Sequence, residues 1–179
     1  MKKIFKYIFA GMAAMSVVAC SEDALETSPS SSVSGNELLG TATNALVSLN
    51  GVYRAMYTAG VSNSSNTHQC FGITAYNLVA DVMGEDCIMN GQGSGWFWYD
   101  CVYNVKSRYT STGWRSYDMW NGYYTWISNV NYILAEEETM SGSETEKNYV
   151  LGQAYAVRAY SYFMLAQMFS RTYKGHESE

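Results

Sequence analysis

Small and aromatic side chains interleave at helical spacing along residues 144–170, and no other stretch constrains the fold as strongly. Its members are Ala154, Tyr155, Ala156, Ala159, Tyr160, Tyr162, Phe163, Ala166 and Phe169. Closely packed helices use this mixture because alanine lets a neighbouring helix approach while aromatic rings fill the space around it. Ser143, followed three residues later by Glu146, matches a capping box at the start of the helix. The run predicts a long helix that is apolar on more than one side and needs neighbours.

Three earlier segments repeat apolar residues at intervals of three and four, which is typical of amphipathic helices. They cover residues 37–56, 70–83 and 116–138. No strand pattern competes strongly, so the sequence predicts an all-α fold whose last two helices form an antiparallel hairpin. In the final helix Ala159, Phe163 and Ala166 match the second-helix pattern of a tetratricopeptide repeat, which predicts tetratricopeptide-like packing.

A long loop rich in glycine and aromatic residues separates the second predicted helix from the third. Glycine occupies positions 84, 91, 93, 95 and 113, and this spacing favours backbone angles that other residues rarely adopt. Trp96, Phe97, Trp98 and Tyr99 follow the cluster of glycines directly. We expect these four aromatic residues to form either a short strand or a clamp within the loop.

The N-terminus has the pattern of a lipoprotein leader. Three lysines precede an apolar stretch from Ile8 to Val18, which is too short to span a bilayer. The Val-Val-Ala-Cys sequence that ends at Cys20 matches a lipobox, so we expect Cys20 to become the lipidated first residue of the mature chain. A plain secretory signal with an incidental cysteine is the alternative. The chain thus divides into a signal peptide over 1–19, a flexible tether over 20–36 and a helical domain over 37–179.

Charge and cysteine spacing exclude several classes of protein. The net charge of −5 and the scarcity of basic clusters argue against nucleic-acid binding and against electrostatic docking to anionic lipid. No C-x-x-C spacing for zinc occurs, and the pairing of Cys70, Cys87 and Cys101 stays open. His68 and His176 are far apart in the sequence and are predicted to be solvated. The sequence therefore predicts neither a metal centre nor a cofactor.

A group of carboxylates gives the enzymatic alternative. Asp81 and Glu85 lie one helical turn apart, with Asp86 and Asp100 nearby. Paired carboxylates can serve a hydrolase or bind Ca²⁺. Asp81, Glu85 and Asp86 fall next to a helix end and a glycine, where solvated acids are common. Since no Ser-His-Asp, Cys-His or phosphate-loop arrangement occurs, we expect a protein that is not an enzyme.

Several segments together resemble the SusD/RagB family of outer-membrane nutrient-binding lipoproteins. They are the lipobox with the acidic residues after it, and the runs Asn44–Tyr53, Trp120–Asn131 and Leu151–Leu165. The last run looks like the family's helix motif GEA-x-x-x-RA-x-x-YF-x-L, with Gln153 in place of the acidic residue. Because proteins of this family are several hundred residues long, we expect the chain to be the N-terminal, incomplete portion of a SusD-like fold.

The resemblance implies nutrient capture without any bond being broken. Members of this family lie as a lid over a SusC-like TonB-dependent transporter, to which they deliver oligosaccharide or, in some members, peptide. The resemblance also implies anchoring to the outer membrane through lipid on Cys20. The pair Glu22 and Asp23 resembles a surface-export signal and favours the cell surface over the periplasmic side. A general tetratricopeptide-like lipoprotein that binds protein partners is the alternative.

The glycine-rich loop provides the expected sugar site. Sugars are bound by aromatic faces against the C–H side of the ring and by polar groups that bond the hydroxyls. Trp96, Trp98 and Tyr99 satisfy the first need, and Asn90 and Gln92 satisfy the second. The alternative is that these aromatic residues only seal the loop against the helices.

Overall fold

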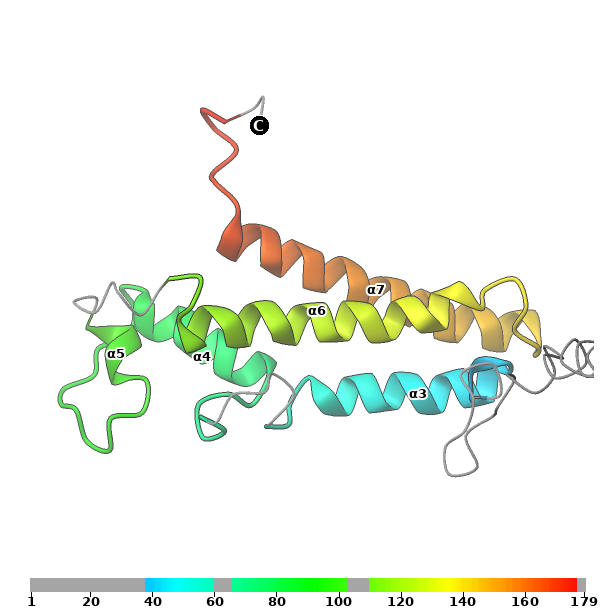
Figure 1. Ribbon diagram of the computed structural model, residues 1–179, viewed down its shortest axis with the longest axis horizontal. Helices are drawn as coiled ribbons and strands as arrows, with labels where there is room; N and C mark the ends of the chain where they lie inside the picture. The colour runs from blue at the N-terminus through cyan, green and yellow to red at the C-terminus, as the bar shows by residue number, and fades with distance from the viewer. Residues whose placement is uncertain (1–37, 60–65, 103–109, 177–179) are drawn as a thin grey trace, which may run out of the picture. The chain divides into compact units, whose positions relative to one another are not determined.

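Five α-helices lie in the part of the chain that the computed structural model describes, residues 38–59, 66–102 and 110–176 (Figure 1). They are α3 (Ala42–Ala55), α4 (Ile73–Met83), α5 (Trp98–Cys101), α6 (Trp114–Ala135) and α7 (Glu144–Phe169). These ranges contain no β-strand, only an isolated bridge between Thr41 and Ser141. The all-α prediction is therefore confirmed. The four aromatic residues of the loop do not form a strand: Trp96 and Phe97 precede the short helix α5, and Trp98 and Tyr99 are its first residues.

Local residues determine where the helices begin. The capping box predicted for α7 is present: the Ser143 hydroxyl accepts the Glu146 N–H at 3.3 Å, and the Glu146 carboxylate accepts the Ser143 N–H at 2.9 Å. Helix α4 begins at Ile73, later than the predicted residue 70, because Gly72 has a φ of 74°. A side chain at Gly72 would collide with the carbonyl group of Met56. Glycine is thus required at this turn on two counts.

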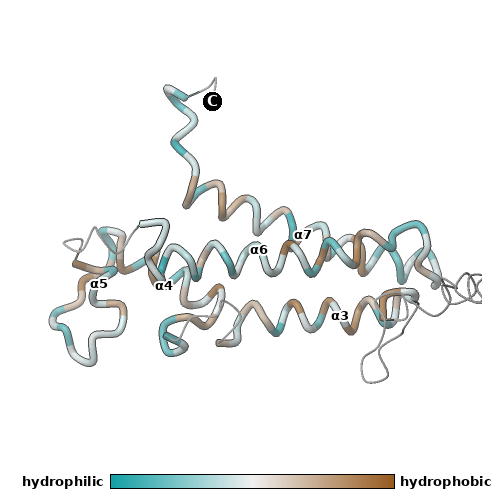
Figure 2. The backbone as a smooth tube through the Cα atoms, in the orientation of Figure 1, coloured by the Kyte–Doolittle hydropathy of each residue, from teal (hydrophilic) through white to brown (hydrophobic). Residues whose placement is uncertain are grey.

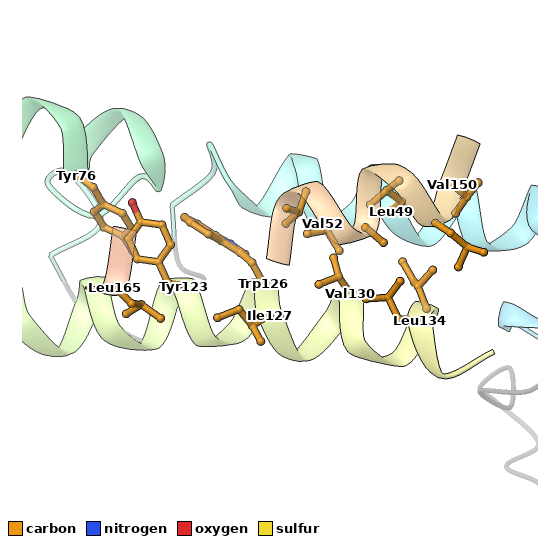
Figure 3. Packing of buried hydrophobic residues seen from close by; sticks show 14 of the residues in the cluster. Leu49, Val52, Tyr76, Tyr123, Trp126, Ile127, Val130, Leu134, Val150 and Leu165 are labelled. Atoms are coloured by element: carbon orange, nitrogen blue, oxygen red, sulfur yellow. The ribbon is translucent and has the colours of Figure 1, made fainter. Parts of the chain in front are cut away.

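Helices α6 and α7 form the predicted antiparallel hairpin, and α3 packs along both of them (Figure 1). Apolar side chains of all three helices meet in the core (Figure 3), among them Leu49, Val52, Val130, Leu134 and Val150. Colouring by hydropathy shows apolar and polar residues alternating along each helix (Figure 2), as expected for helices buried on one face. The hairpin is confirmed, whereas its tetratricopeptide-like form stays a prediction.

A hydrogen bond between side chains also joins α3 to α7. The Tyr53 hydroxyl donates to Gln153 Oε1 at 3.0 Å. Gln153 is the residue that stands in place of the acid in the family motif, and its amide oxygen keeps an acceptor at this position. Partial burial raises the pKa of Tyr53, so the phenol stays protonated as the donor.

Helix α4 packs on α6 through an aromatic cluster. Tyr76 lies 5.4 Å from Tyr123 and 5.9 Å from Trp126, measured between ring centroids. Its hydroxyl donates to the backbone carbonyl of Asp118 at 3.0 Å. The close approach depends on Gly122, since a side chain there would collide with the Tyr76 hydroxyl. Burial raises the pKa of both tyrosines, so neither ionises at physiological pH.

Some sequence predictions concern residues outside the described ranges or stay open. The signal peptide, Cys20 and the tether precede residue 38 and lie outside the described residues. Cys70 is buried, Cys87 is exposed and Cys101 is half-buried. None of the helices in the described part of the chain has both the length and the apolar character needed to cross a bilayer.

Candidate functional site

Glycine residues shape the loop that carries the predicted sugar-binding side chains. Gly93 and Gly95 have φ values of 51° and 86°, in the region where residues with a Cβ are strained. The Gly95 N–H donates to the Gln92 carbonyl at 2.8 Å, which closes a tight turn. Phe97 follows with a φ of 57°, the one positive value among the non-glycine residues described. Such an angle persists only where surrounding contacts hold it.

Those contacts come from the segment before α4 and from α6. The Phe97 N–H donates to Gln69 Oε1 at 2.8 Å. The Phe97 ring is buried, meets Phe71 edge-on at 6.3 Å and lies 5.3 Å from the guanidinium carbon of Arg115. Phe97 therefore anchors the loop to the helices.

A buried ion pair holds the other side of the loop. Arg115 Nη2 and Nε bond the two carboxylate oxygens of Asp100 at 2.8 and 3.2 Å, and both side chains are at most 5% exposed. Arg115 Nη1 also donates to the Gln69 backbone carbonyl at 2.8 Å. Trp114 stacks on the same guanidinium, 4.2 Å from its carbon to the ring centroid. Because the bidentate geometry is directional, α5 and the segment around Gln69 are fixed to the start of α6.

The predicted ligand residues differ in how far their side chains are exposed. Trp96 is 52% exposed and Tyr99 is 39% exposed, whereas Trp98 is half-buried. Asn90 and Gln92 are exposed. The ring of His68 lies 5.1 Å from that of Trp96, and His68 Nε2 is 3.0 Å from the Gln69 side chain. Trp96 and Tyr99 are thus available to a ligand, with His68 beside Trp96.

The acidic residues of the enzymatic alternative do not form one group. Asp81, Glu85 and Asp86 are exposed, whereas Asp100 is buried against Arg115. Among the described residues, no three His, Cys, Asp or Glu side chains come together in a way that could hold a metal ion.

Sequence reasoning missed Arg115, Gln69 and His68. A signal for Arg115 existed, since its position shares the helical period of the buried face of α6. A buried arginine needs an acceptor, and Asp100 is the nearest preceding acid in the sequence. No comparable pattern pointed to Gln69 or His68.

Comparison with known proteins finds a match for more than half of the chain. Residues 77–179 match a SusD-like family model that is described as "Starch-binding associating with outer membrane". The matched stretch includes the glycine-rich loop, the Arg115–Asp100 pair and the α6–α7 hairpin. Searches of curated proteins and of solved structures found no match.

Proposed function

The chain belongs to the SusD-like family of starch-binding proteins that associate with the outer membrane, and from this premise we propose that it captures oligosaccharide at the cell surface and passes it to a SusC-like TonB-dependent transporter. In this proposal the protein breaks no bond. Lipid on Cys20 anchors it, and the tether over 20–36 gives the helical domain reach above the membrane.

The exposure of Trp96 and Tyr99 on a fixed base carries the proposal. Binding energy is lost when a ligand has to order a mobile loop, so a loop fixed beforehand binds more tightly. Phe97, Gln69 and the Arg115–Asp100 pair supply that fixation. Exposed aromatic side chains then offer the apolar faces on which sugar rings stack. Asn90 and Gln92 are exposed on the same loop and supply polar groups for sugar hydroxyls.

Retention on a polysaccharide tests the binding step. We expect Trp96→Ala combined with Tyr99→Ala to abolish the slowing of the purified chain in a native gel that contains soluble starch. Tyr132→Ala with Tyr149→Ala is the matched control, because these two tyrosines are also exposed but lie on α6 and α7. Unchanged retention of a folded loop variant would refute the loop as the sugar site.

Two further measurements test anchoring and delivery. Cys20→Ala should release the protein from the outer-membrane fraction, since the lipid has no other attachment point in this proposal. Affinity purification of the lipidated protein should recover a TonB-dependent barrel. Recovery of peptide in place of glycan would favour a peptide-binding member of the same uptake system. Recovery of an assembly complex without a barrel would favour a tetratricopeptide-like protein-interaction lipoprotein.

A further inference from the structure

An aromatic pocket lies between α6 and the end of α7. At this end α7 diverges from α6 (Figure 1). Its volume is about 360 Å³, within the range of about 300–1,000 Å³ that is usual for small-ligand sites. The lining residues are Ser111, Ser116, Tyr117, Trp120 and Phe169. Four of them lie on α6 and α7, and Ser111 lies just before α6.

The rings at this pocket form a row across the two helices. Phe169 meets Trp120 edge-on, with 5.1 Å between centroids and an angle of 87°. Trp120 lies 4.7 Å from Tyr124, which in turn meets Tyr162 edge-on at 6.4 Å. Each of the four side chains is between 38% and 47% exposed. Ring–ring contacts restrain these side chains, so a ligand would not have to order them.

The chemistry of the lining distinguishes this pocket from its neighbour. The neighbouring pocket has a similar volume of about 390 Å³ and shares Ser116 and Phe169 with the aromatic pocket. The rest of its lining is mainly aliphatic and thioether side chains, with Tyr76 and Arg115 beside them. Surfaces of that kind suit the packing of protein side chains. The described lining of the aromatic pocket has no aliphatic and no charged side chain, and it combines the rings of Trp120 and Phe169 with three hydroxyl groups. This combination matches a neutral ligand that has an apolar face and many hydroxyls.

We propose that the row Trp120, Tyr124, Tyr162 and Phe169, with the pocket beside it, is a second binding site for a neutral oligosaccharide. The proposal rests on the proposed function, because it takes glycan as the ligand class. A sugar ring stacks on Trp120, while the hydroxyls of Ser111, Ser116 and Tyr117 bond its polar edge. A chain that binds glycan at two places gains from linked binding when one oligosaccharide reaches both.

Trp120→Ala combined with Phe169→Ala tests this site. We expect the apparent affinity for maltoheptaose, measured by titration calorimetry, to fall roughly tenfold. Trp120→Tyr should keep most of the affinity, because a stacking ring remains. The Tyr132→Ala and Tyr149→Ala control should bind like the wild type. Circular dichroism verifies that every variant is folded.

The outcomes separate this inference from the loop site. If the loop variant loses starch retention but the Trp120 and Phe169 variant binds normally, the second site is wrong and the proposed function stands. If the second variant loses affinity and the loop variant does not, the second site stands and the loop site is wrong. If the Trp120 and Phe169 variant changes only self-association, measured by light scattering, the occupant of the pocket is protein and the second site is wrong. Wild-type protein that binds no glycan would refute both.

Discussion

The two halves of α6 are held in different ways. Its C-terminal half packs through aliphatic residues, with Val130 and Ile133 buried against α3 and α7. Its N-terminal half buries Arg115 and Asp118, and Arg115 bonds Asp100 and Gln69 outside the helix. Apolar packing is non-directional and tolerates exchange of similar volumes, whereas charged hydrogen bonds require one geometry. The C-terminal half therefore builds the bundle, and the N-terminal half orients the glycine-rich loop.

Removal of Trp126 should have the largest effect, because this residue joins the two halves. Its side chain is fully buried and contacts Tyr76 and Tyr123. We expect Trp126→Ala to lower the free energy of unfolding by about 4 kcal/mol, from lost burial and the remaining cavity. Chemical denaturation measures the change. Trp120→Ala, at a partly exposed position on the same helix, is the control and should cost less than about 1 kcal/mol. Equal effects of the two changes would contradict this account.

Arg115→Met should have the next largest effect. It tests the N-terminal half of α6, which is held by charged hydrogen bonds. The substitution leaves the Asp100 carboxylate buried without its cation, at a cost of about 3 kcal/mol in unfolding free energy. Adding Asp100→Leu should restore much of that stability, because apolar side chains of similar size can replace a buried pair. Starch retention should stay low in the double variant, since the bond from Arg115 to Gln69 is still absent.

Measuring stability and retention on the same variants separates folding from positioning. Full recovery of starch retention in the stable double variant would mean that the ion pair only supports the fold. In that case the directional bonds would not explain how the loop is oriented. Wild-type stability in the Arg115→Met single variant would contradict the buried pair itself.

The same contrast explains which parts of the structure the sequence could predict. The contacts of Leu49, Val130 and Val150 follow from apolar residues repeated at helical spacing, so the helices and the hairpin could be read directly. Arg115 and Asp100 are 15 residues apart in the sequence, and Arg115 and Gln69 are 46 residues apart. No periodicity relates such positions. Likewise, Phe97 is buried while its neighbour Trp96 is exposed, an outcome set by unusual backbone angles.

Gly122→Ala should test the contact between α4 and the N-terminal half of α6. A Cβ at this position meets the Tyr76 hydroxyl, so Tyr76 has to move and its bond to the Asp118 carbonyl is lost. We expect a loss of about 2 kcal/mol in unfolding free energy. Gly152→Ala is the matched control in α7, where nothing lies near the added methyl group. It should be neutral or stabilising by up to about 1 kcal/mol. A stabilising Gly122→Ala would mean that Tyr76 is not held in this position.

Glu146→Gln should have the smallest effect on stability. It tests the capping box at the start of α7. Hydrogen bonds from Ser143 lower the pKa of the Glu146 carboxyl below its ordinary value of 4.5. A lowered pKa in the folded state means that the charged form adds stability above pH 4.5, and that this contribution is lost as the pH falls through the folded value. Glutamine completes a capping box without a charge. The melting temperature of the wild type should therefore exceed that of Glu146→Gln slightly at pH 7, and the two should converge near pH 3.

Glu144→Gln, in the same first turn, is the control for a general effect of charge at the helix N-terminus. A difference between wild type and Glu146→Gln that is constant from pH 7 to pH 3 would show that the carboxylate adds nothing to the box.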